Sequence, residues 1–452
     1  MSRICIIGAG PAGTTFATRM AALGHETVLI ERARFPRPCL GESLSAAVLP
    51  LLASIGAAAA IESAGFRRIE SVERKWEADT EIRRDPHAEG LLVDRGVFDA
   101  LLLENARRHA VQVLQPACVR ECRRDAEGWN LRLQTPRGER RLHAEFLADA
   151  RGRCSSAQKQ TEPRTIAFYA YWGGPRLPSQ PRIEAGEDAW YWGVPLPSGL
   201  YNTLVFADRS QARSMAKEFR ERIMRSGLMR GCDDVHLVSP ILAADATPRV
   251  HPDSVTPDSI RVGDAALAVD PLSSSGVQKA IQTALSGAIV ANTLLRKPEL
   301  REAALTFYRD SIRDASERHR RWAASYYAEV AATRDQPFWQ RRAMKTAVPQ
   351  AAMAVAPSPG VSLSLSREVE FVDTPCLEGD FVTLKTAVRH PTLEGPVAYL
   401  GGWELAPLLK TITSGMRGEQ IALSWSSRIP LQSALKMTGW LSKNGILVES
   451  GL

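Results

Sequence analysis

The stretch that decides the fold is residues 3–32, RICIIGAGPAGTTFATRMAALGHETVLIER. An apolar, β-prone run over residues 3–7 leads into a glycine-rich turn, a helix and a second β-prone run over residues 27–30. A strand, a glycine turn, a helix and a second strand in this order are typical of a dinucleotide-binding unit. The sequence therefore predicts an α/β fold built on a Rossmann-like sheet.

Each glycine of the turn has its own reason to be glycine. Gly8 permits the tight turn, Gly10 lets the backbone approach a pyrophosphate, and Gly13 lets the helix pack close to the strand. The helix N-terminus then presents unpaired N–H groups to the phosphates. Glu31, which ends the second strand, can accept hydrogen bonds from a ribose. We therefore expect a dinucleotide to be bound by Gly8, Gly10, Pro11, Ala12, Gly13, Glu31 and Arg32.

A later segment, residues 259–295, predicts a strand end, a small polar loop and a long helix. Asp264 follows a glycine at the strand end, where a carboxylate can bind the ribityl chain of FAD. The small residues after the Asp270-Pro271 turn let the backbone lie against an isoalloxazine ring. The helix begins near Val277, and its N-terminal dipole suits a reduced flavin. We therefore expect contacts to the flavin from Asp264, Pro271, Ser275, Gly276 and Val277.

Together these segments resemble the FAD-dependent aromatic hydroxylases. In that family a pair like Asp94-Arg95 precedes an amphipathic helix, and the arginine approaches the flavin and its phosphates. The stretch FLADARGRCS, residues 146–155, resembles the family's D-A-T-G segment, with Arg151 in place of the threonine. The resemblance implies that Arg95 contacts FAD. It also implies a Rossmann-like domain assembled from separated segments, with an inserted mixed or antiparallel sheet that covers the flavin.

This resemblance divides the chain into four expected parts. They are an FAD-binding domain (1–65, 91–160 and 257–300), a substrate-binding sheet domain (66–90 and 161–256), a helical segment (301–349) and a small C-terminal α+β domain (350–452). Within the sheet domain we expect a hairpin that turns at Pro197–Gly199. The C-terminal domain reads as helices followed by a strand pair with a turn at residues 443–445, which outlines either a winged-helix or peptide-binding module, or a packing appendage.

Four motifs narrow the resemblance to the flavin-dependent halogenases. They are CLGESL (39–44), WYWGVP (190–195), DPLSSSGV (270–277) and ATRDQPFW (332–339). The resemblance implies that Ser43, in the first motif, contacts the flavin. In the family, W-x-W-x-x-P is thought to stop a flavin hydroperoxide from hydroxylating the substrate directly. Because residues alternate along a strand, we expect Trp190 and Trp192 to share the face that shapes the space an aromatic ring enters. The resemblance adds Pro195, the last residue of the motif, to this substrate pocket.

Two residues of the halogenase chemistry are missing at their usual places. The glutamate that tryptophan halogenases place in the flavin-side loop falls at Ser273, and the lysine that holds the hypohalous species falls at Ile69. Lys75 is near, but it precedes Trp76 in a charged strand, where an exposed lysine is the ordinary role. The catalytic candidates are therefore Lys75 and Glu42, where Glu42 is either a base that deprotonates the aromatic substrate or a brace for the flavin loop.

Without halogenation, the chemistry that the resemblance implies is oxygen transfer. Reduced FAD and O₂ would form a C4a-hydroperoxide whose distal oxygen passes to an aromatic ring, with electrons from NAD(P)H directly or through a flavin reductase. The motifs and the extra tail also resemble the flavoproteins that mature tryptophylquinone cofactors beside quinohemoprotein amine dehydrogenase or related oxidases. That resemblance implies hydroxylation of a tryptophan in a precursor protein or peptide. Three alternatives remain: a halogenase of a small or carrier-bound aromatic, a reductase of the geranylgeranyl-reductase kind, and a flavin-bearing chaperone.

Composition argues against several other classes. The 452 residues carry a net charge of +7 that is spread along the chain, without the basic stripe or module of a nucleic-acid-binding protein. The sequence shows no secretory signal and no run of 18 apolar residues. Its seven cysteines are scattered, and Cys118 and Cys122 have no second pair at zinc spacing. We therefore expect a cytoplasmic protein that binds no nucleic acid, membrane or metal.

Overall fold

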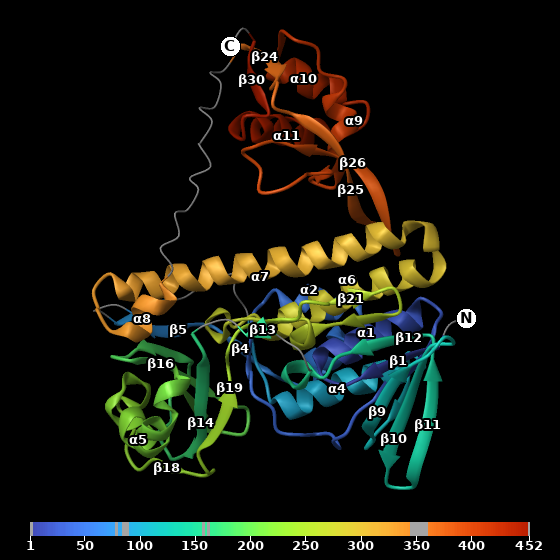
Figure 1. The fold of residues 1–452 in the computed structure, drawn as a ribbon. Coiled ribbons are helices and arrows are strands. Elements are labelled where there is room, and N and C mark those ends of the chain that lie inside the picture. Colours follow the sequence, from blue (N-terminus) through green and yellow to red (C-terminus); the bar gives the residue numbers. More distant parts are fainter. Residues whose placement is uncertain are drawn as a thin grey trace. The chain divides into compact units, whose positions relative to one another are not determined.

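The computed structural model describes residues 3–76, 80–83, 90–155, 159–160, 163–343 and 360–450, whose helices and strands are drawn in Figure 1. The chain forms two compact units. The larger unit comprises Met1–Arg301 and Tyr308–Met344, and the smaller unit comprises Glu302–Phe307 and Lys345–Leu452. Apolar cores form within the larger unit and, separately, within the smaller one, so each unit is described by itself.

The first sheet of the larger unit has six strands in the order β21-β22-β12-β1-β2-β8. The five strands from β22 to β8 run parallel, which confirms the predicted Rossmann-like sheet. Its central strand is buried, as its apolar sequence requires. The strands are β1 (Arg3–Ile7), β2 (Glu26–Ile30), β8 (Gln112–Leu114), β12 (Phe146–Asp149), β21 (Val255–Thr256) and β22 (Ser259–Arg261).

Three long helices belong to this half of the unit: α1 (Pro11–Ala22), α4 (Arg95–Arg108) and α6 (Gly276–Arg296). Helix α1 begins with proline, whose missing N–H is not needed in a first turn. Helix α4 is capped by Asp94, whose Oδ1 accepts hydrogen bonds from the amides of Gly96 (2.7 Å) and Val97 (3.1 Å). The sequence therefore determines where each helix begins, and all three N-termini border the site described below.

Smaller elements complete this half. The antiparallel sheet β11-β10-β9 consists of β9 (Cys118–Arg124), β10 (Trp129–Thr135) and β11 (Gly138–Ala144). The sheet β3-β7-β4 consists of β3 (Ser43–Leu44), β4 (Arg67–Ile69) and β7 (Gly90–Leu92), near helices α2 (Val48–Ser54) and α3 (Ala58–Ser63). A third small sheet consists of β13 (Lys159–Gln160), β20 (Arg249–Val250) and β23 (Leu267–Ala268). Strand β4 thus pairs with β7, although the sequence placed residues 66–90 in the substrate-binding sheet.

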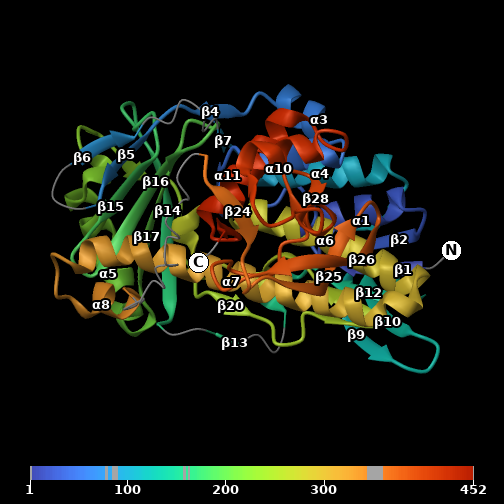
Figure 2. The same cartoon turned by 90° about the horizontal axis from the view of Figure 1, so that it is seen from above.

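The second large sheet of this unit has eight strands. Its order is β18-β14-β17-β16-β15-β5-β6, and β19 pairs with β14. It is mixed, because β15 and β5 run parallel and the other pairs are antiparallel. The strands are β5 (Val72–Lys75), β6 (Thr80–Arg83), β14 (Thr165–Gly173), β15 (Arg182–Ala185), β16 (Ala189–Pro195), β17 (Tyr201–Asp208), β18 (His236–Leu237) and β19 (Leu242–Asp245), most of which are seen together in Figure 2.

The predicted hairpin is present as β16 and β17. Its turn is closed by hydrogen bonds from the Leu196 amide to the Leu200 carbonyl (2.8 Å) and from the Gly199 amide to the Leu196 carbonyl (3.0 Å). Gly199 has a φ of +80°, which a side chain would strain. Helix α5 (Ala212–Arg225) packs its buried face against one side of the hairpin, where Tyr191 lies. Trp190 belongs to the opposite side, so the predicted alternation is confirmed.

Two helices follow: α7 (Arg301–Ala331) and α8 (Pro337–Arg342). The proline, phenylalanine and tryptophan of the late halogenase-like motif form the first turn of α8. Trp339 is fully buried, lies edge-on to Trp76 with ring centroids 5.6 Å apart, and donates its Nε1–H to the Glu187 carbonyl (2.9 Å). This motif therefore holds α8 against the second large sheet.

The smaller unit contains a three-stranded sheet, β29-β24-β30, and three helices. Its elements are β24 (Ser362–Leu365), β25 (Glu370–Glu378), β26 (Phe381–Arg389), β27 (Tyr399–Leu400), β28 (Trp403–Glu404), α9 (Leu405–Leu409), β29 (Met416–Arg417), α10 (Gly418–Trp425), α11 (Leu431–Lys443) and β30 (Leu447–Glu449). The long β25–β26 hairpin was not predicted from the sequence.

The predicted strand pair around residues 443–445 is wrong. Lys443 ends α11, and Gly445, with φ +68°, closes the helix while the Ile446 amide donates to the Leu441 carbonyl (2.9 Å). The strand that follows, β30, pairs with β24 instead. Whether this region is a winged-helix or peptide-binding module or a packing appendage stays a prediction. Within the described ranges, no helix is both long and apolar enough to cross a bilayer.

Replacing Trp339 by alanine tests the anchoring role of α8. The variant loses a fully buried ring and its hydrogen bonds. We therefore expect the free energy of unfolding of the larger unit, measured by urea titration, to fall by about 3–5 kcal/mol. The matched control is Trp322→Ala in α7, because Trp322 is 38% exposed. This change should lower the free energy of unfolding by about 1 kcal/mol or less. Equal costs for the two variants would contradict the anchoring role.

Candidate functional site

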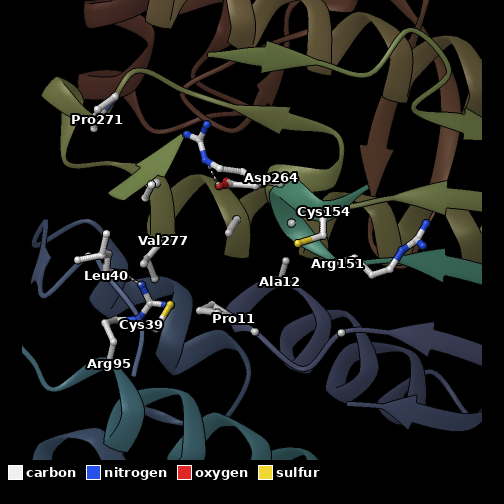
Figure 3. Close-up of a pocket in the computed structure, with 18 of the residues that line it drawn as sticks. Pro11, Ala12, Cys39, Leu40, Arg95, Arg151, Cys154, Asp264, Pro271 and Val277 are labelled. Carbon is white, nitrogen blue, oxygen red and sulfur yellow. Dashed lines mark hydrogen bonds and ion pairs between the residues drawn. The ribbon is translucent and has the colours of Figure 1, made fainter. Parts of the chain in front are cut away.

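A cavity of about 890 Å³ lies between the two large sheets of the larger unit. Its walls come from the glycine turn after β1, the loop after β2, the start of α6 and one face of the eight-stranded sheet. The residues labelled in Figure 3 show how the first three walls face each other: Pro11, Ala12, Cys39, Leu40 and Arg95 on one side, Asp264, Pro271 and Val277 across from them, and Arg151 and Cys154 at one end. Elements far apart in sequence thus enclose one space.

The glycine turn has the geometry of a phosphate cradle. Gly8 has a φ of +103°, and a Cβ there would lie 2.5 Å from the carbonyl oxygen of Ala150. A Cβ at Gly13 would lie 1.8 Å from the Gly8 carbonyl oxygen, so Gly13 permits helix packing and does not itself line the cavity. Gly10 lines it, and a Cβ there would meet only a guanidinium nitrogen of Arg37, 3.8 Å away. The open space over Gly10 and the N-terminus of α1 fits a pyrophosphate.

The expected ribose-binding carboxylate, Glu31, lies at the cavity wall and is buried. Its two oxygens accept hydrogen bonds from the amides of Ala9 (2.9 Å) and Ala33 (2.8 Å). These bonds fix the carboxylate between the glycine turn and the loop after β2, and each oxygen retains a lone pair for a ribose hydroxyl. Arg32 lines the same wall.

Arg95 projects from the start of α4 to the cavity. Its guanidinium pairs with Asp99 through Nε (3.0 Å) and Nη2 (3.2 Å) and donates from Nη1 to the Leu40 carbonyl (2.7 Å). Burial lowers the pKa of Arg95, but the Asp99 carboxylate raises it by more, so the group stays charged. A Cβ at Gly41 would lie 2.9 Å from Nη1 of this arginine. The arginine thus holds the G-E-S loop beside the cavity.

Asp264 occupies the facing wall between two cations. Lys279 Nζ lies 2.7 Å from its Oδ1, and Arg153 Nε lies 3.4 Å from its Oδ2. Burial raises the pKa of Asp264, yet the charges of Lys279 and Arg153 lower it by more, so the net shift is downward and the carboxylate is ionised. An anionic acceptor fixed by two cations suits the hydroxyls of a ribityl chain. The sequence reading missed both partners.

The loop before α6 forms part of the cavity wall. Pro271, Gly276 and Val277 line the cavity, as does Ser274, whose φ is +47°. Ser275 does not line it, and its hydroxyl lies 2.7 Å from the hydroxyl of Ser273. The remaining predicted contact, Ser43, lines the cavity from β3.

The eight-stranded sheet presents an aromatic face to the same space. Trp190 stacks on Phe206 with ring centroids 3.8 Å apart and an interplanar angle of 8°. Directly paired residues of neighbouring strands share a face, so one cross-strand row reads Ala244, Ala167, Phe206 and Trp190, and all four line the cavity. Trp192 and Leu204 line it from the next row. Pro195, at the end of β16, does not line the cavity.

Glu42 lies where the G-E-S loop meets this sheet. Its Oε1 accepts hydrogen bonds from the Asn202 amide (2.9 Å) and the Tyr171 hydroxyl (3.3 Å), and its Oε2 from the Gly41 amide (3.0 Å). The carboxyl is buried yet lines the cavity. Burial raises its pKa above the ordinary value, although its backbone and Asn202 hydrogen bonds oppose the rise. Such a group accepts a proton more readily than an exposed glutamate does.

Lys75 lies elsewhere. Its Nζ pairs with Glu184 Oε1 at 3.1 Å, its side chain is 42% exposed, and the two border a separate, smaller cavity with Arg334. No lysine occurs among the described residues that line the large cavity. The described residues also contain no cluster of three or more histidine, cysteine, aspartate or glutamate side chains able to hold a metal.

Three partners of the predicted residues had no motif to reveal them. Tyr171 and Asn202 contact Glu42 from β14 and β17, and Lys279 contacts Asp264 from α6. Strand alternation from Trp192 and Leu204 would have placed Asn202 on the cavity face, but not its carboxylate partner. Only the packing of the loop on the sheet brings these groups together.

Comparison with known proteins agrees with this geometry. The family model described as tryptophan halogenase matches residues 73–358. A tryptophan 2-halogenase from Chondromyces crocatus is 29% identical over 373 residues, which cover 75% of this chain and 70% of that protein.

Two solved structures have similar folds. One is the "Peptidyl tryptophan dihydroxylase QhpG essential for tryptophylquinone cofactor biogenesis", 28% identical with a TM-score of 0.76 over 98% of this chain and 99% of that one. The other is the flavin-dependent halogenase CmlS, with a TM-score of 0.83 and 18% identity over 99% of this chain and 96% of that one. At that identity, CmlS supports the fold alone.

Alanine at Gly10 tests the cradle without disturbing the packing. Its Cβ would have room in the free protein, so we expect unchanged thermal stability without FAD and a loss of FAD affinity of about tenfold or more, because the methyl group blocks the close backbone approach. Fluorescence titration of FAD and thermal melts measure both quantities.

Gly8→Ala serves as the contrasting variant. Its Cβ would collide with the Ala150 backbone at a positive φ, so it should lower the stability of the protein even without FAD. If Gly10→Ala binds FAD as tightly as the wild type, the pyrophosphate does not lie over this turn.

Proposed function

The chain belongs to the tryptophan halogenase family, and we propose that within this family it is an FAD-dependent monooxygenase. Its proposed reaction is the hydroxylation of a tryptophan side chain within a polypeptide. The family makes it a flavin-dependent oxidoreductase that modifies an aromatic group. The finer proposal is carried by the cavity wall, which keeps the aromatic face but contains no lysine among its described residues. Halogenation by this family requires that ammonium group, whereas oxygen transfer does not.

The cofactor would be held by the residues of the two facing walls. Gly8, Gly10 and the start of α1 would bind the pyrophosphate, Glu31 the ribose, and Asp264 the ribityl chain. Bound FAD, once reduced, supplies activation of O₂. Under this proposal the electrons come from NAD(P)H, either directly or through a flavin reductase.

The aromatic face would orient the substrate ring. The stacked pair of Trp190 and Phe206 is rigid, because both rings are buried. Trp192 and Ile183, which face each other across β16 and β15, extend the apolar wall. Apolar walls exclude water from the reacting ring and hold it in one plane.

Glu42 would accept the proton that the substrate releases. Glu42 lines the cavity, and its carboxylate oxygens are held by Asn202, Tyr171 and the Gly41 amide. Its raised pKa brings the carboxyl closer to neutral pH than an exposed glutamate, which is the range in which a base is most effective.

A polypeptide substrate is part of the proposal for two reasons. The relative of 28% identity, which matches the chain over 98% of its length, is a peptidyl tryptophan dihydroxylase. A relative of 24% identity, a chlorinase described as acting on 1H-pyrrole-2-carbonyl bound to a peptidyl-carrier protein, also has a protein-attached substrate. Halogenation is the second candidate function, since the tryptophan 2-halogenase shares 29% identity with the chain.

Comparing the proteomes of the source organism with and without this gene tests the proposal directly. We expect a tryptophan peptide that carries one or two added oxygen atoms in the wild type and none in the deletion strain. Mass spectrometry of digested protein measures it, and complementation with the wild-type gene, but not with Gly10→Ala, should restore the modification. A bromine or chlorine isotope pattern on the same tryptophan would overturn the proposal in favour of halogenation, and identical proteomes would overturn both.

The pH profile tests Glu42. Because its pKa is raised, we expect the turnover rate to fall as pH drops through that raised value and the base becomes protonated. Glu42→Gln should remove this acidic limb and lower the rate about 10²–10⁴-fold. Asn202→Leu should move the limb to higher pH, because it removes a donor that opposes the rise in pKa. A limb unchanged in both variants would show that another group is the base.

A further inference from the structure

One edge of the eight-stranded sheet carries a cluster of exposed apolar side chains. Val238, Ile241 and Leu242 are 45%, 36% and 40% exposed and lie within five consecutive positions. The other large exposed apolar side chains described in the larger unit are scattered singly over α4, α5 and α7. Exposed apolar residues gathered at one place mark a surface that contacts another molecule.

Strand β19, at this edge, also has backbone groups directed away from the sheet. It pairs with β14 in antiparallel register, and no described strand lies along its other side (Figure 1). The Ala246 amide donates to the Thr165 carbonyl at 3.0 Å, and antiparallel bonding alternates, so Ala244 directs its N–H and carbonyl toward β14. Ala243 therefore directs its N–H and carbonyl outward, and it is exposed.

The same strand leads into the cavity. Ala244 faces Ala167 across the strand pair, and both line the cavity in one row with Phe206 and Trp190. The two alanines are the smallest side chains of this row, and Ala167 is buried, so the wall of the cavity between β19 and the stacked aromatic pair consists of small side chains. Leu242, two residues before Ala244, lies on the same side of the sheet.

We propose that β19 is the docking edge for the polypeptide substrate, which adds to it as an extended strand. The tryptophan side chain of that segment then passes over Ala244 and Ala167 to the aromatic pair. This inference rests on the proposed function, because it names how a polypeptide reaches that site. Backbone pairing supplies affinity, and Leu242, Ile241 and Val238 contact apolar side chains of the segment.

Ala243→Pro tests the docking edge. Proline removes the outward N–H that a substrate strand would use, and proline is tolerated on an edge strand where that N–H faces solvent. The probe is a fluorescein-labelled peptide containing the tryptophan found by the proteome comparison with its own flanking residues. If that comparison yields none, the probe is a pool of peptides with one central tryptophan and randomised flanks.

We expect Ala243→Pro to weaken peptide binding about tenfold in fluorescence polarisation, since the pairing loses a backbone hydrogen bond and leaves a partner group unpaired. Leu242→Glu should weaken it as well. Met224→Glu is the matched control, because Met224 is a 44% exposed apolar residue on α5, and it should bind like the wild type. FAD affinity and melting temperature should remain unchanged in all three variants.

Hydrogen exchange tests directly whether the peptide pairs with the backbone of β19. Bound peptide should slow exchange of the Ala243 amide in the wild type and not in Leu242→Glu at the same peptide concentration. Equal affinity of Ala243→Pro and the wild type, or no slowing at residues 241–245, would overturn the proposal. So would a wild-type dimer that Ala243→Pro dissociates in size-exclusion chromatography, because a second copy would then cover this edge.

The two proposals fail separately. Peptide that binds at β19 without any oxygenation of its tryptophan would leave the docking edge in place and overturn the proposed activity. Oxygenation at the same kcat/KM in the wild type and Ala243→Pro would leave the activity in place and overturn the docking edge.

Discussion

The whole site depends on one close approach of backbone to backbone. The carbonyl oxygen of Gly8 lies so near Gly13 that a Cβ there would be only 1.8 Å away, and Gly8 itself presses against the backbone of Ala150. This approach brings the turn after β1, the first turn of α1 and the end of β12 to one point. Gly263 continues the same packing, since a Cβ there would lie 2.6 Å from the Cβ of Ala12. If Gly8, Gly13 or Gly263 carried a side chain, α1 and α6 could not converge on the cavity.

Hydrogen bonds and apolar packing together hold the loop before α6 against the aromatic face of the eight-stranded sheet. Asp270 caps the turn before α6 through the Leu272 amide (3.0 Å) and accepts a hydrogen bond from the Tyr327 hydroxyl (3.1 Å). Tyr327 and Trp339 pack in the same core as Trp190. The flavin-side loop, α7, α8 and the aromatic face therefore form one connected body. A core assembled in this way resists changes in ring position, as transfer to one position of a substrate ring requires.

The sequence predicts the elements that depend on local patterns and misses those that depend on packing at a distance. Glycine spacing predicts the turn after β1, and alternation predicts which tryptophans face the cavity, because both follow from backbone geometry within a few residues. The partners of Glu42 and Asp264 could not be read in the same way, since a loop, two strands and a helix converge on them only in the folded chain. The strand pair predicted around Gly445 was wrong because a glycine after lysine and asparagine is equally compatible with a hairpin turn and with a helix end. The roles assigned to individual residues toward FAD and substrate stay predictions.

The placement of lysine side chains is the observation on which the proposal of hydroxylation depends. Lys75 lies beyond the cavity wall in an ion pair with Glu184, and Lys279 is buried under Asp264, where it also donates to the Leu267 carbonyl. Lys279 does not line the cavity, and moving its ammonium there would leave Asp264 less well compensated. The titratable group at the junction of loop and aromatic face is instead Glu42, an acidic side chain. A carboxylate can accept the ring proton that is released in hydroxylation or in halogenation, so the proposal of hydroxylation depends on the cavity wall, whose described residues include no lysine.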